Sequence, residues 1–343
     1  MPDLPGQVTA TALGPWPGED PVEAGRIIRG ELGSPHLPFL AELPGRGVGS
    51  DALGRTASLL EGLAADVQPY GWRLVDRPGK DYLRARSALS TDLNILADLI
   101  GAEESPAPEI KVQLRGPLSL AAGLHLHHGE RALIDHGARR DLAASLAAGM
   151  DDFLRRVAGA APGARITVQL DEPDIAAVLA GTIPTSSGYR TLRAVAGSEA
   201  TESWRLVVDA LRAAGAAEIV IAVPEVEAPF ERILAAGADG IAVPLRALTS
   251  RQWEHLAAAV EAGKRLWAGV LPVDEPAAAL PRVPEAVEAL WRPWRQIGLP
   301  AAALGAVRVT PAGGLAGHIP ASATAVLGRL TQVADGLNQL ALG

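Results

Sequence analysis

Short apolar runs of strand length recur along the chain, and stretches with a helical spacing of apolar residues separate most of them. The runs cover residues 8–13, 39–43, 110–115, 165–170, 218–223, 240–243, 266–271 and 306–309. Runs that are apolar throughout, such as residues 219–223, are typical of strands buried on both faces of a parallel sheet. Among the helical stretches, residues 138–158 are the clearest, because apolar side chains recur there at spacings of three and four.

Predicted strands that alternate with helices indicate an α/β protein with a parallel sheet. The number of runs and the length of 343 residues favour a single (β/α)8 TIM barrel over the alternative, an open doubly wound sheet. No low-complexity linker divides the chain, so we expect residues 1–343 to form one domain. Residues 68–86 contain Gly71, Pro78 and Gly79, and we expect an excursion or hairpin there between the second and third strands.

Composition and charge narrow the class of partners. The chain carries 39 acidic and 31 basic residues, a net charge of -8, and no basic run, so we expect neither nucleic acid nor an anionic membrane as a partner. No apolar run is long enough to span a bilayer, and the first residues lack the features of a signal peptide, so we expect a cytoplasmic protein. The absence of cysteine excludes disulfides, thiolate nucleophiles and thiolate-bound metals.

In a barrel of this kind, chemistry takes place at the carboxyl ends of the strands. The strongest polar signal at such an end is Gln169-Leu-Asp-Glu-Pro173, with two adjacent carboxylates. Neighbours on a strand point to opposite faces, so we expect one carboxylate at the barrel mouth and the other against the following helix. The alternative is that these residues only cap that helix.

Five short motifs at predicted strand ends together resemble the cobalamin-independent methionine synthase family. They begin at Ala12 (Ala-Leu-Gly-Pro-Trp-Pro), Glu42 (Glu-Leu-Pro), Gly116 (Gly-Pro-Leu-Ser), Gln169 (Gln-Leu-Asp-Glu-Pro) and Val309 (Val-Thr-Pro-Ala-Gly-Gly-Leu). They occur in the family's order and span most of the chain. The resemblance implies a (β/α)8 barrel that transfers a methyl group from a folate to the thiol of homocysteine, which a zinc ion activates.

The resemblance also locates the family's zinc ligands, a histidine, two cysteines and an acid. In this chain Ala222, Pro224, Pro244 and Gly313 stand at those positions, and none of their side chains can bind zinc. We therefore expect no metal and no resident cofactor. A folate stays open as an alternative that no residue of the sequence supports. The small-residue loop at 312–317 retains the alternative of a phosphate site.

At the positions that the family uses to bind homocysteine, this chain retains more of the family's residues than at the zinc positions. The resemblance implies that Asp171 binds the ligand's amino group, that Glu42 is a second acid there, and that the backbone at Gly14 contacts the carboxylate. Pro15 has no N–H, so one donor to that carboxylate is lost. Trp16 and Trp267 lie near predicted strand ends, where an aromatic ring is placed to stack on a planar ligand.

Three hypotheses follow. The first is a methionine synthase-like barrel without its zinc site, which binds a small, amino-acid-like molecule at the mouth. The second is a non-catalytic sensor or assembly protein. The third is another reaction in a related barrel, such as decarboxylation, for which the predicted strand ends supply Arg46 and Arg115. The sequence leaves open whether the protein is an enzyme and which oligomer it forms.

Overall fold

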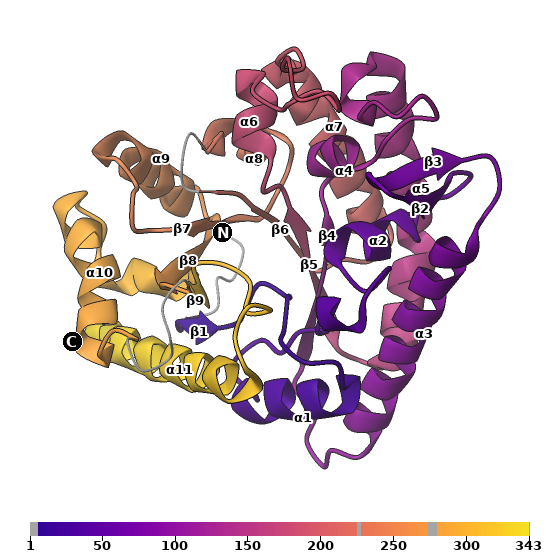
Figure 1. Ribbon diagram of the computed structural model, residues 1–343. Helices are drawn as coiled ribbons and strands as arrows, with labels where there is room; N and C mark the ends of the chain where they lie inside the picture. The colour runs from indigo at the N-terminus through magenta and orange to yellow at the C-terminus, as the bar shows by residue number, and fades with distance from the viewer. Residues whose placement is uncertain (1–5, 225–227, 274–279, 343) are drawn as a thin grey trace.

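A curled parallel sheet of seven strands forms the centre of the protein (Figure 1). The computed structural model describes residues 6–224, 228–273 and 280–342. The strands occur in the order β1 (Thr9–Ala10), β9 (Val307–Pro311), β8 (Arg265–Leu271), β7 (Gly240–Pro244), β6 (Glu218–Ala222), β5 (Arg165–Asp171) and β4 (Glu109–Arg115). Each predicted run except residues 39–43 overlaps one of these strands. The fold is therefore α/β and TIM-barrel-like.

Residues 37–42 connect the two edges of this sheet without forming a regular strand. On one side, the Leu37 N–H donates to Ala10 O at 3.0 Å; on the other, the Leu40 N–H donates to Lys111 O at 2.9 Å. The pairing consists of isolated bridges, Pro15 with Glu42 and Phe39 with Lys111. The prediction of a regular strand at 39–43 was therefore wrong, because Pro38 and Pro44 flank the segment and have no N–H to continue a ladder.

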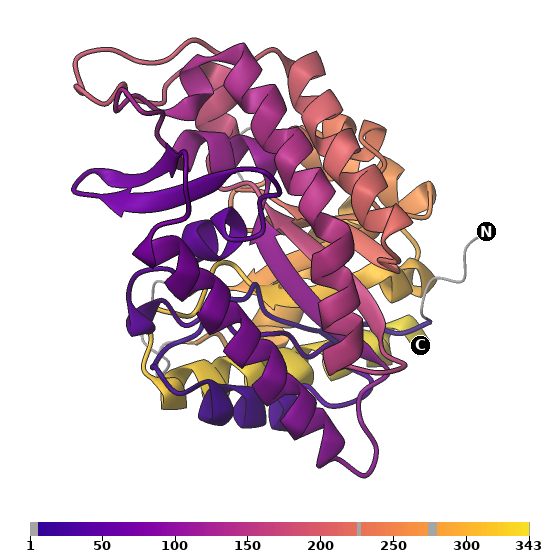
Figure 2. The same ribbon diagram turned by 90° about the vertical axis from the view of Figure 1, so that its right-hand side faces the viewer.

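Helices surround the sheet on its outer side (Figures 1 and 2). The described α-helices are α1 (Pro21–Glu31), α2 (Ala52–Ala57), α3 (Lys80–Gly101), α4 (Pro117–Gly123), α5 (His136–Ala160), α6 (Ile175–Ala180), α7 (Gly197–Ala213), α8 (Phe230–Ala235), α9 (Ser250–Glu261), α10 (Val283–Gln296) and α11 (Pro320–Leu342). Four of these helices have an N-cap residue whose side chain accepts a hydrogen bond from the first turn: Asp20, Asp51, Asp135 and Thr249. No helix within the described residues is long and apolar enough to cross a membrane.

A hairpin projects from the body of the molecule between the irregular segment and β4 (Figure 2). It consists of the antiparallel strands β2 (Ala64–Gln68) and β3 (Gly71–Val75). Gly71 follows the turn with a φ of 125°, a conformation that favours glycine. The excursion or hairpin expected at residues 68–86 thus corresponds to the second half of this hairpin and the first turns of α3.

Alternate residues of the strands form two separate apolar cores. Ile110, Val112 and Leu114 of β4 belong to the main core under the helices. On the opposite face, Val220, Ala242 and Trp267 form a small cluster with Leu37 and Ala222. The two faces follow from the period of two along a strand. The inner face can therefore present polar groups at its ends while the outer face secures the fold.

The amino-terminal end of the inner face is filled by a buried charged network. Arg308, with 2% of its side chain exposed, donates to Glu109 at 3.3 Å, and its guanidinium lies 5.2 Å from the centre of the Trp267 ring. The indole N–H of Trp267 donates to Glu218 at 3.2 Å. Burial lowers the pKa of Arg308 to about 10. Trp267 is therefore fully buried at this end, and its expected place near a ligand at the mouth was wrong.

Candidate functional site

A cavity of about 450 Å³ opens at the carboxyl ends of the strands. Its polar side chains come from Arg115 at the end of β4, Asp171 at the end of β5 and Thr310 in β9. Its other walls are apolar or glycine: Leu13, Pro15, Ala52, Pro173, Ala222, Val223, Pro224, Ala242, Val243, Pro244, Pro311, Ala312, Gly313 and Gly314. We call this cavity the mouth pocket. Its size and its few convergent polar groups are typical of a small-molecule site.

Asp171 is the acidic side chain of the mouth pocket. The Gln169 side-chain N–H donates to Asp171 Oδ1 at 2.6 Å and to the Leu13 carbonyl at 2.8 Å, which holds the carboxylate at the strand end. Burial raises the pKa of Asp171 to about 6, against the opposing effects of the Gln169 hydrogen bond and the charge of Lys111. The carboxylate is therefore largely ionised at neutral pH.

Glu172 points to the opposite face and supports the helices. Its carboxylate accepts from the backbone N–H of Leu118 at 3.1 Å and of Ser119 at 2.7 Å, and from the indole N–H of Trp204 at 2.8 Å. These donors belong to α4 and α7, whereas we expected support for α6. Neither carboxylate caps α6, whose N-cap, Asp174, makes no side-chain capping bond.

Glu172→Gln is expected to lower the free energy of unfolding by about 2 kcal/mol, because an amide N–H must then face one of the buried N–H donors. Denaturation in urea at neutral pH measures this change. Glu288→Gln, on the exposed side of α10, is the matched control and is expected to change stability by less than about 0.5 kcal/mol. Equal stabilities of the two variants would show that the Glu172 hydrogen bonds contribute nothing.

Glu42 lies behind the mouth pocket rather than in its wall. Only 1% of the residue is exposed, and neither carboxylate oxygen has a hydrogen-bond partner among the described residues. Burial raises the pKa of Glu42 to about 7, while the charge of Arg55 opposes the shift and that of Asp171 adds to it. The residue expected to be a second acid at the ligand is therefore a buried carboxyl group without direct access to the mouth pocket.

Lys111 of β4 is fully buried in the interior, where the charges of both acids act on it. Its ammonium donates to Gln169 Oε1 at 2.9 Å and to Gln113 Oε1 at 3.2 Å, and lies 5.1 Å from the centre of the Phe39 ring. Burial lowers the pKa of Lys111 to about 7, although the charges of Asp171 and Glu42 oppose this. Gln169 thus links Lys111 to Asp171 at the strand end.

The raised pKa of Glu42 predicts a stability that falls as the pH rises. Between the ordinary glutamate value of 4.5 and the folded value of about 7, the unfolded chain loses the Glu42 proton while the folded protein keeps it. Over this window the folded state loses about 3 kcal/mol relative to a neutral side chain. Glu42→Gln is therefore expected to unfold at increasingly higher urea concentration than the wild type as the pH is raised from 4.5 to 8. If the urea midpoints of the two proteins change with pH in the same way, the proton on Glu42 is not the cause of the pH dependence.

The four positions at which the family resemblance implies zinc ligands all lie in the wall of the mouth pocket. Ala222, Pro224, Pro244 and Gly313 come from β6, β7 and the segments that follow β6 and β9, and all line it. Their side chains are apolar or absent, so they offer no donor to zinc. Within the described residues, no group of three or more histidine, aspartate or glutamate side chains is placed to hold a metal ion. The residues present therefore do not fit a zinc ion.

Gly14 and Trp16 lie near the mouth pocket but do not line it. A side chain at Gly14, where φ is 126°, would collide with Gln113 at 2.5 Å, so glycine is required there for packing. Trp16 is 1% exposed and packs against Phe39 with 6.3 Å between ring centres. Pro15, between them, does contribute to the wall. Of the four expected ligand-binding residues, only Asp171 therefore faces the cavity.

Arg46, one of the two arginines expected at the strand ends, is engaged elsewhere. Its guanidinium donates to both carboxylate oxygens of Asp92 at 2.8 Å, and Arg55 pairs with the same carboxylate. This arrangement fixes the segment after residue 42 to α3. Arg115 is therefore the arginine of the mouth pocket.

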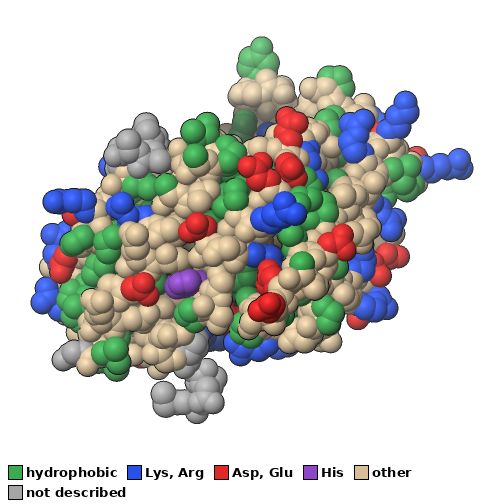
Figure 3. Space-filling model, turned by 90° about the horizontal axis from the view of Figure 1, so that it is seen from below, with side chains coloured by type: hydrophobic (Ala, Val, Ile, Leu, Met, Phe, Trp, Pro, Cys, Tyr) green, Lys and Arg blue, Asp and Glu red, His purple; other side chains and the backbone are tan. Residues whose placement is uncertain are grey.

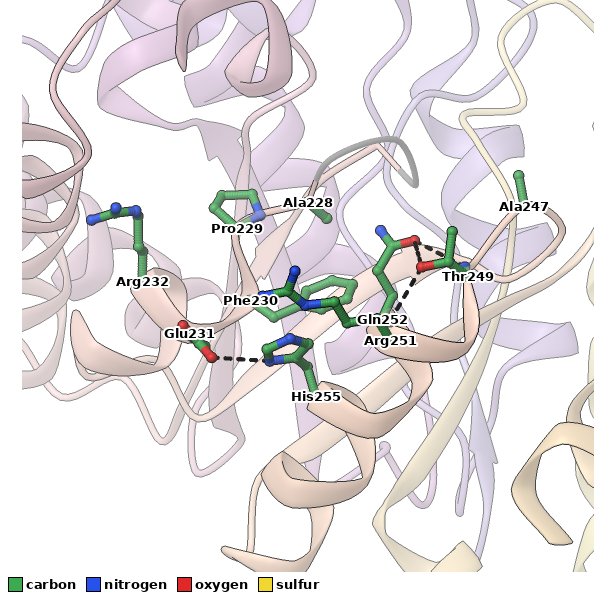
Figure 4. A pocket seen from close by; sticks show the side chains of 10 residues that line it. All are labelled: Ala228, Pro229, Phe230, Glu231, Arg232, Ala247, Thr249, Arg251, Gln252 and His255. Atoms are coloured by element: carbon green, nitrogen blue, oxygen red, sulfur yellow. Dashed lines mark hydrogen bonds and ion pairs between the residues drawn. The ribbon is translucent and has the colours of Figure 1, made fainter. Parts of the chain in front are cut away.

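Other cavities among the described residues lie away from Asp171, and two of them are near the carboxyl-terminal half of the sheet. One of about 520 Å³ lies between α8 and α9 and shares no residue with the mouth pocket; His255 Nδ1 and Glu231 Oε1 are 3.1 Å apart there (Figure 4). Another of about 710 Å³ adjoins the mouth pocket at Pro244, Ala312 and Gly313 and extends toward α10. Elsewhere, on the face shown in Figure 3, acidic and basic side chains are interspersed.

No family model and no curated protein matches the chain. Solved structures do resemble it. A B12-independent methionine synthase from Shewanella sp. W3-18-1, in complex with selenomethionine, has a TM-score of 0.62 at 11% identity, over 97% of this chain and 98% of that one. A methyltransferase from Methanosarcina mazei has a TM-score of 0.54 at 12% identity, over 96% and 94%. At these identities the likeness shows the fold alone.

Proposed function

We propose that the chain is a methionine synthase-like barrel that binds a small, amino-acid-like ligand in the mouth pocket and does not perform zinc-dependent methyl transfer. One observation carries the proposal: the wall of a single cavity includes Asp171 together with Ala222, Pro224, Pro244 and Gly313. The likeness to a methionine synthase that binds selenomethionine supports the kind of ligand. In this proposal residues 37–42 are the irregular second strand of a TIM barrel.

The chemistry of the mouth pocket suits such a ligand. Above a pH of about 6, Asp171 presents an ionised carboxylate to an ammonium group, and Gln169 holds it in place. The apolar walls contributed by β6 and β7 suit an uncharged side chain. Because these walls carry no thiolate or imidazole, a thiol bound there would lack the metal that makes it a nucleophile at neutral pH.

The proposal includes no resident metal, folate, nucleic acid or membrane, and it locates the protein in the cytoplasm. A decarboxylase that uses two arginines for a carboxylate-rich substrate is less favoured, because Arg46 is engaged with Asp92. A role as a sensor is compatible with ligand binding, and would differ only in what the bound state signals.

Thermal unfolding with and without L-methionine tests the proposal. A ligand present at about 100 times its Kd stabilises the folded state by about 2.7 kcal/mol, so the midpoint is expected to rise by a few degrees. Methyl transfer from methyl-folate to homocysteine is expected to be undetectable, with or without added zinc. An unchanged midpoint with both L-methionine and L-homocysteine, or measurable methyl transfer, would contradict the proposal.

A further inference from the structure

Two side chains of opposite charge stand next to each other at the edge of the mouth pocket. Arg115 ends β4 and Asp171 ends β5, and they are register partners in the parallel ladder. Adjacent strands are about 4.8 Å apart, so the two side chains start from neighbouring points. The Gly116 N–H donates to Asp171 O at 2.8 Å, which fixes the two strand ends against each other. Both residues line the cavity.

The Arg115 guanidinium has no hydrogen bond or ion pair in the part of the chain that the structure describes. Arg46 and Arg55, in contrast, are both paired with Asp92. Asp171 is not within ion-pair distance of Arg115, and Gln169 occupies its Oδ1. A cation and an anion thus border the same cavity with donor and acceptor capacity left over. A ligand placed between them can use both.

The rest of the cavity limits what that ligand can be. Beyond Arg115 and Asp171, Thr310 is the only polar side chain among the described residues of its wall, and the others are apolar or glycine. A simple amine would leave Arg115 unpaired, and a dicarboxylate would place a second negative charge against Asp171 or against apolar walls. A molecule that carries an ammonium and a carboxylate on one carbon gives both Asp171 and Arg115 a partner of opposite charge. If the rest of the molecule is uncharged, it can lie against the apolar wall.

We propose that Arg115 binds the α-carboxylate and Asp171 the α-ammonium of a free α-amino acid with an uncharged side chain, which lies against β6 and β7. This inference rests on the proposed function and narrows it to zwitterionic ligands. Arg115 is then a specificity-determining residue, and its planar guanidinium can donate two parallel hydrogen bonds to a carboxylate.

Calorimetric titrations with three probes at a pH of about 8 test the inference: L-methionine, 3-(methylthio)propylamine, which lacks the carboxylate, and 4-(methylthio)butanoate, which lacks the ammonium. Arg115→Gln is expected to weaken L-methionine binding by about 10- to 100-fold and to leave the amine's affinity within about twofold. Arg115→Lys is expected to recover part of the loss. Arg140→Gln, an exposed change of equal charge on α5, is the control and is expected to bind all probes as the wild type does.

Each outcome distinguishes the inference from the proposed function. If Arg115→Gln binds L-methionine as tightly as the wild type, or loses affinity equally for L-methionine and the amine, the role of Arg115 is refuted while amino-acid binding stands. If the wild type binds none of the three probes, the proposed function fails and the inference with it. Thermal unfolding of each variant verifies the fold, which we expect to be intact because the Arg115 side chain makes no hydrogen bond within the described structure.

Discussion

Asp171→Asn is expected to weaken the binding of L-methionine by about 100-fold at a pH of about 8, where the wild-type carboxylate is ionised. The change keeps the size of the side chain and removes the charge that pairs with the ligand's ammonium, an interaction of about 1.5–3 kcal/mol. Calorimetric titration measures it. Asp174→Asn is the matched control, because Asp174 lies three residues further along and outside the cavity wall.

The same carboxylate predicts how affinity depends on pH. Because the pKa of Asp171 is raised to about 6, protonation below that value removes its charge. Wild-type affinity is therefore expected to fall by about tenfold for each pH unit below 6 and to level off above it, whereas Asp171→Asn has a flat profile. If Asp171→Asn binds L-methionine as tightly as the wild type, Asp171 is not the partner of the ammonium. The same conclusion follows if the affinities of both proteins depend on pH in the same way.

Restoring metal ligands is expected to create a zinc site where the wild type has none. The variant with Ala222→His, Pro224→Cys, Pro244→Glu and Gly313→Cys places four donors around one cavity. We expect it to bind one zinc ion with submicromolar Kd, and the wild type to retain no stoichiometric zinc after dialysis. Metal analysis and competition with a chromophoric chelator measure both.

The control for this experiment is the pair Ala222→His and Gly313→Cys, which supplies only two donors and is expected to bind zinc at least about 100-fold more weakly. A side chain at Gly313 would lie 3.0 Å from Val273 Cγ2, so a small loss of stability accompanies the change. Thermal unfolding verifies that each variant folds. Stoichiometric zinc at the mouth of the wild type, or a folded four-donor variant that binds no tighter than the two-donor one, would contradict the assignment of these positions.

The sequence predicts most of the sheet, because strands such as β6 and β7 are short, mostly apolar runs buried on both faces. Continuous runs such as that of β6 leave no competing helical pattern, and their ends agree with the structure to within a residue or two. The run at 39–43 is also mostly apolar, yet its pairing with Lys111 and Pro15 consists of isolated bridges. The flanking prolines make this segment irregular, because they have no backbone N–H to continue a ladder. A hydrophobicity pattern does not record missing backbone donors.

The side chains of the site are harder to predict, because their depth along a strand decides their role. Trp267 is the third residue of β8, and four residues at about 3.3 Å each separate it from the strand's end. Lys111 was overlooked, although β4 alternates Glu109, Lys111 and Gln113 with apolar residues, a pattern that indicates a polar inner face. The burial of Glu42 depends on packing from several elements and has no signal in the sequence.

Calorimetric titration of L-methionine into chelator-treated wild-type protein tests the central claim most directly, because it asks whether the mouth pocket binds an amino acid without metal. The account predicts saturable binding of one ligand per chain at a pH of about 8, with the same Kd before and after one equivalent of zinc is added. No heat beyond dilution, or binding that appears only when zinc is added, would contradict it.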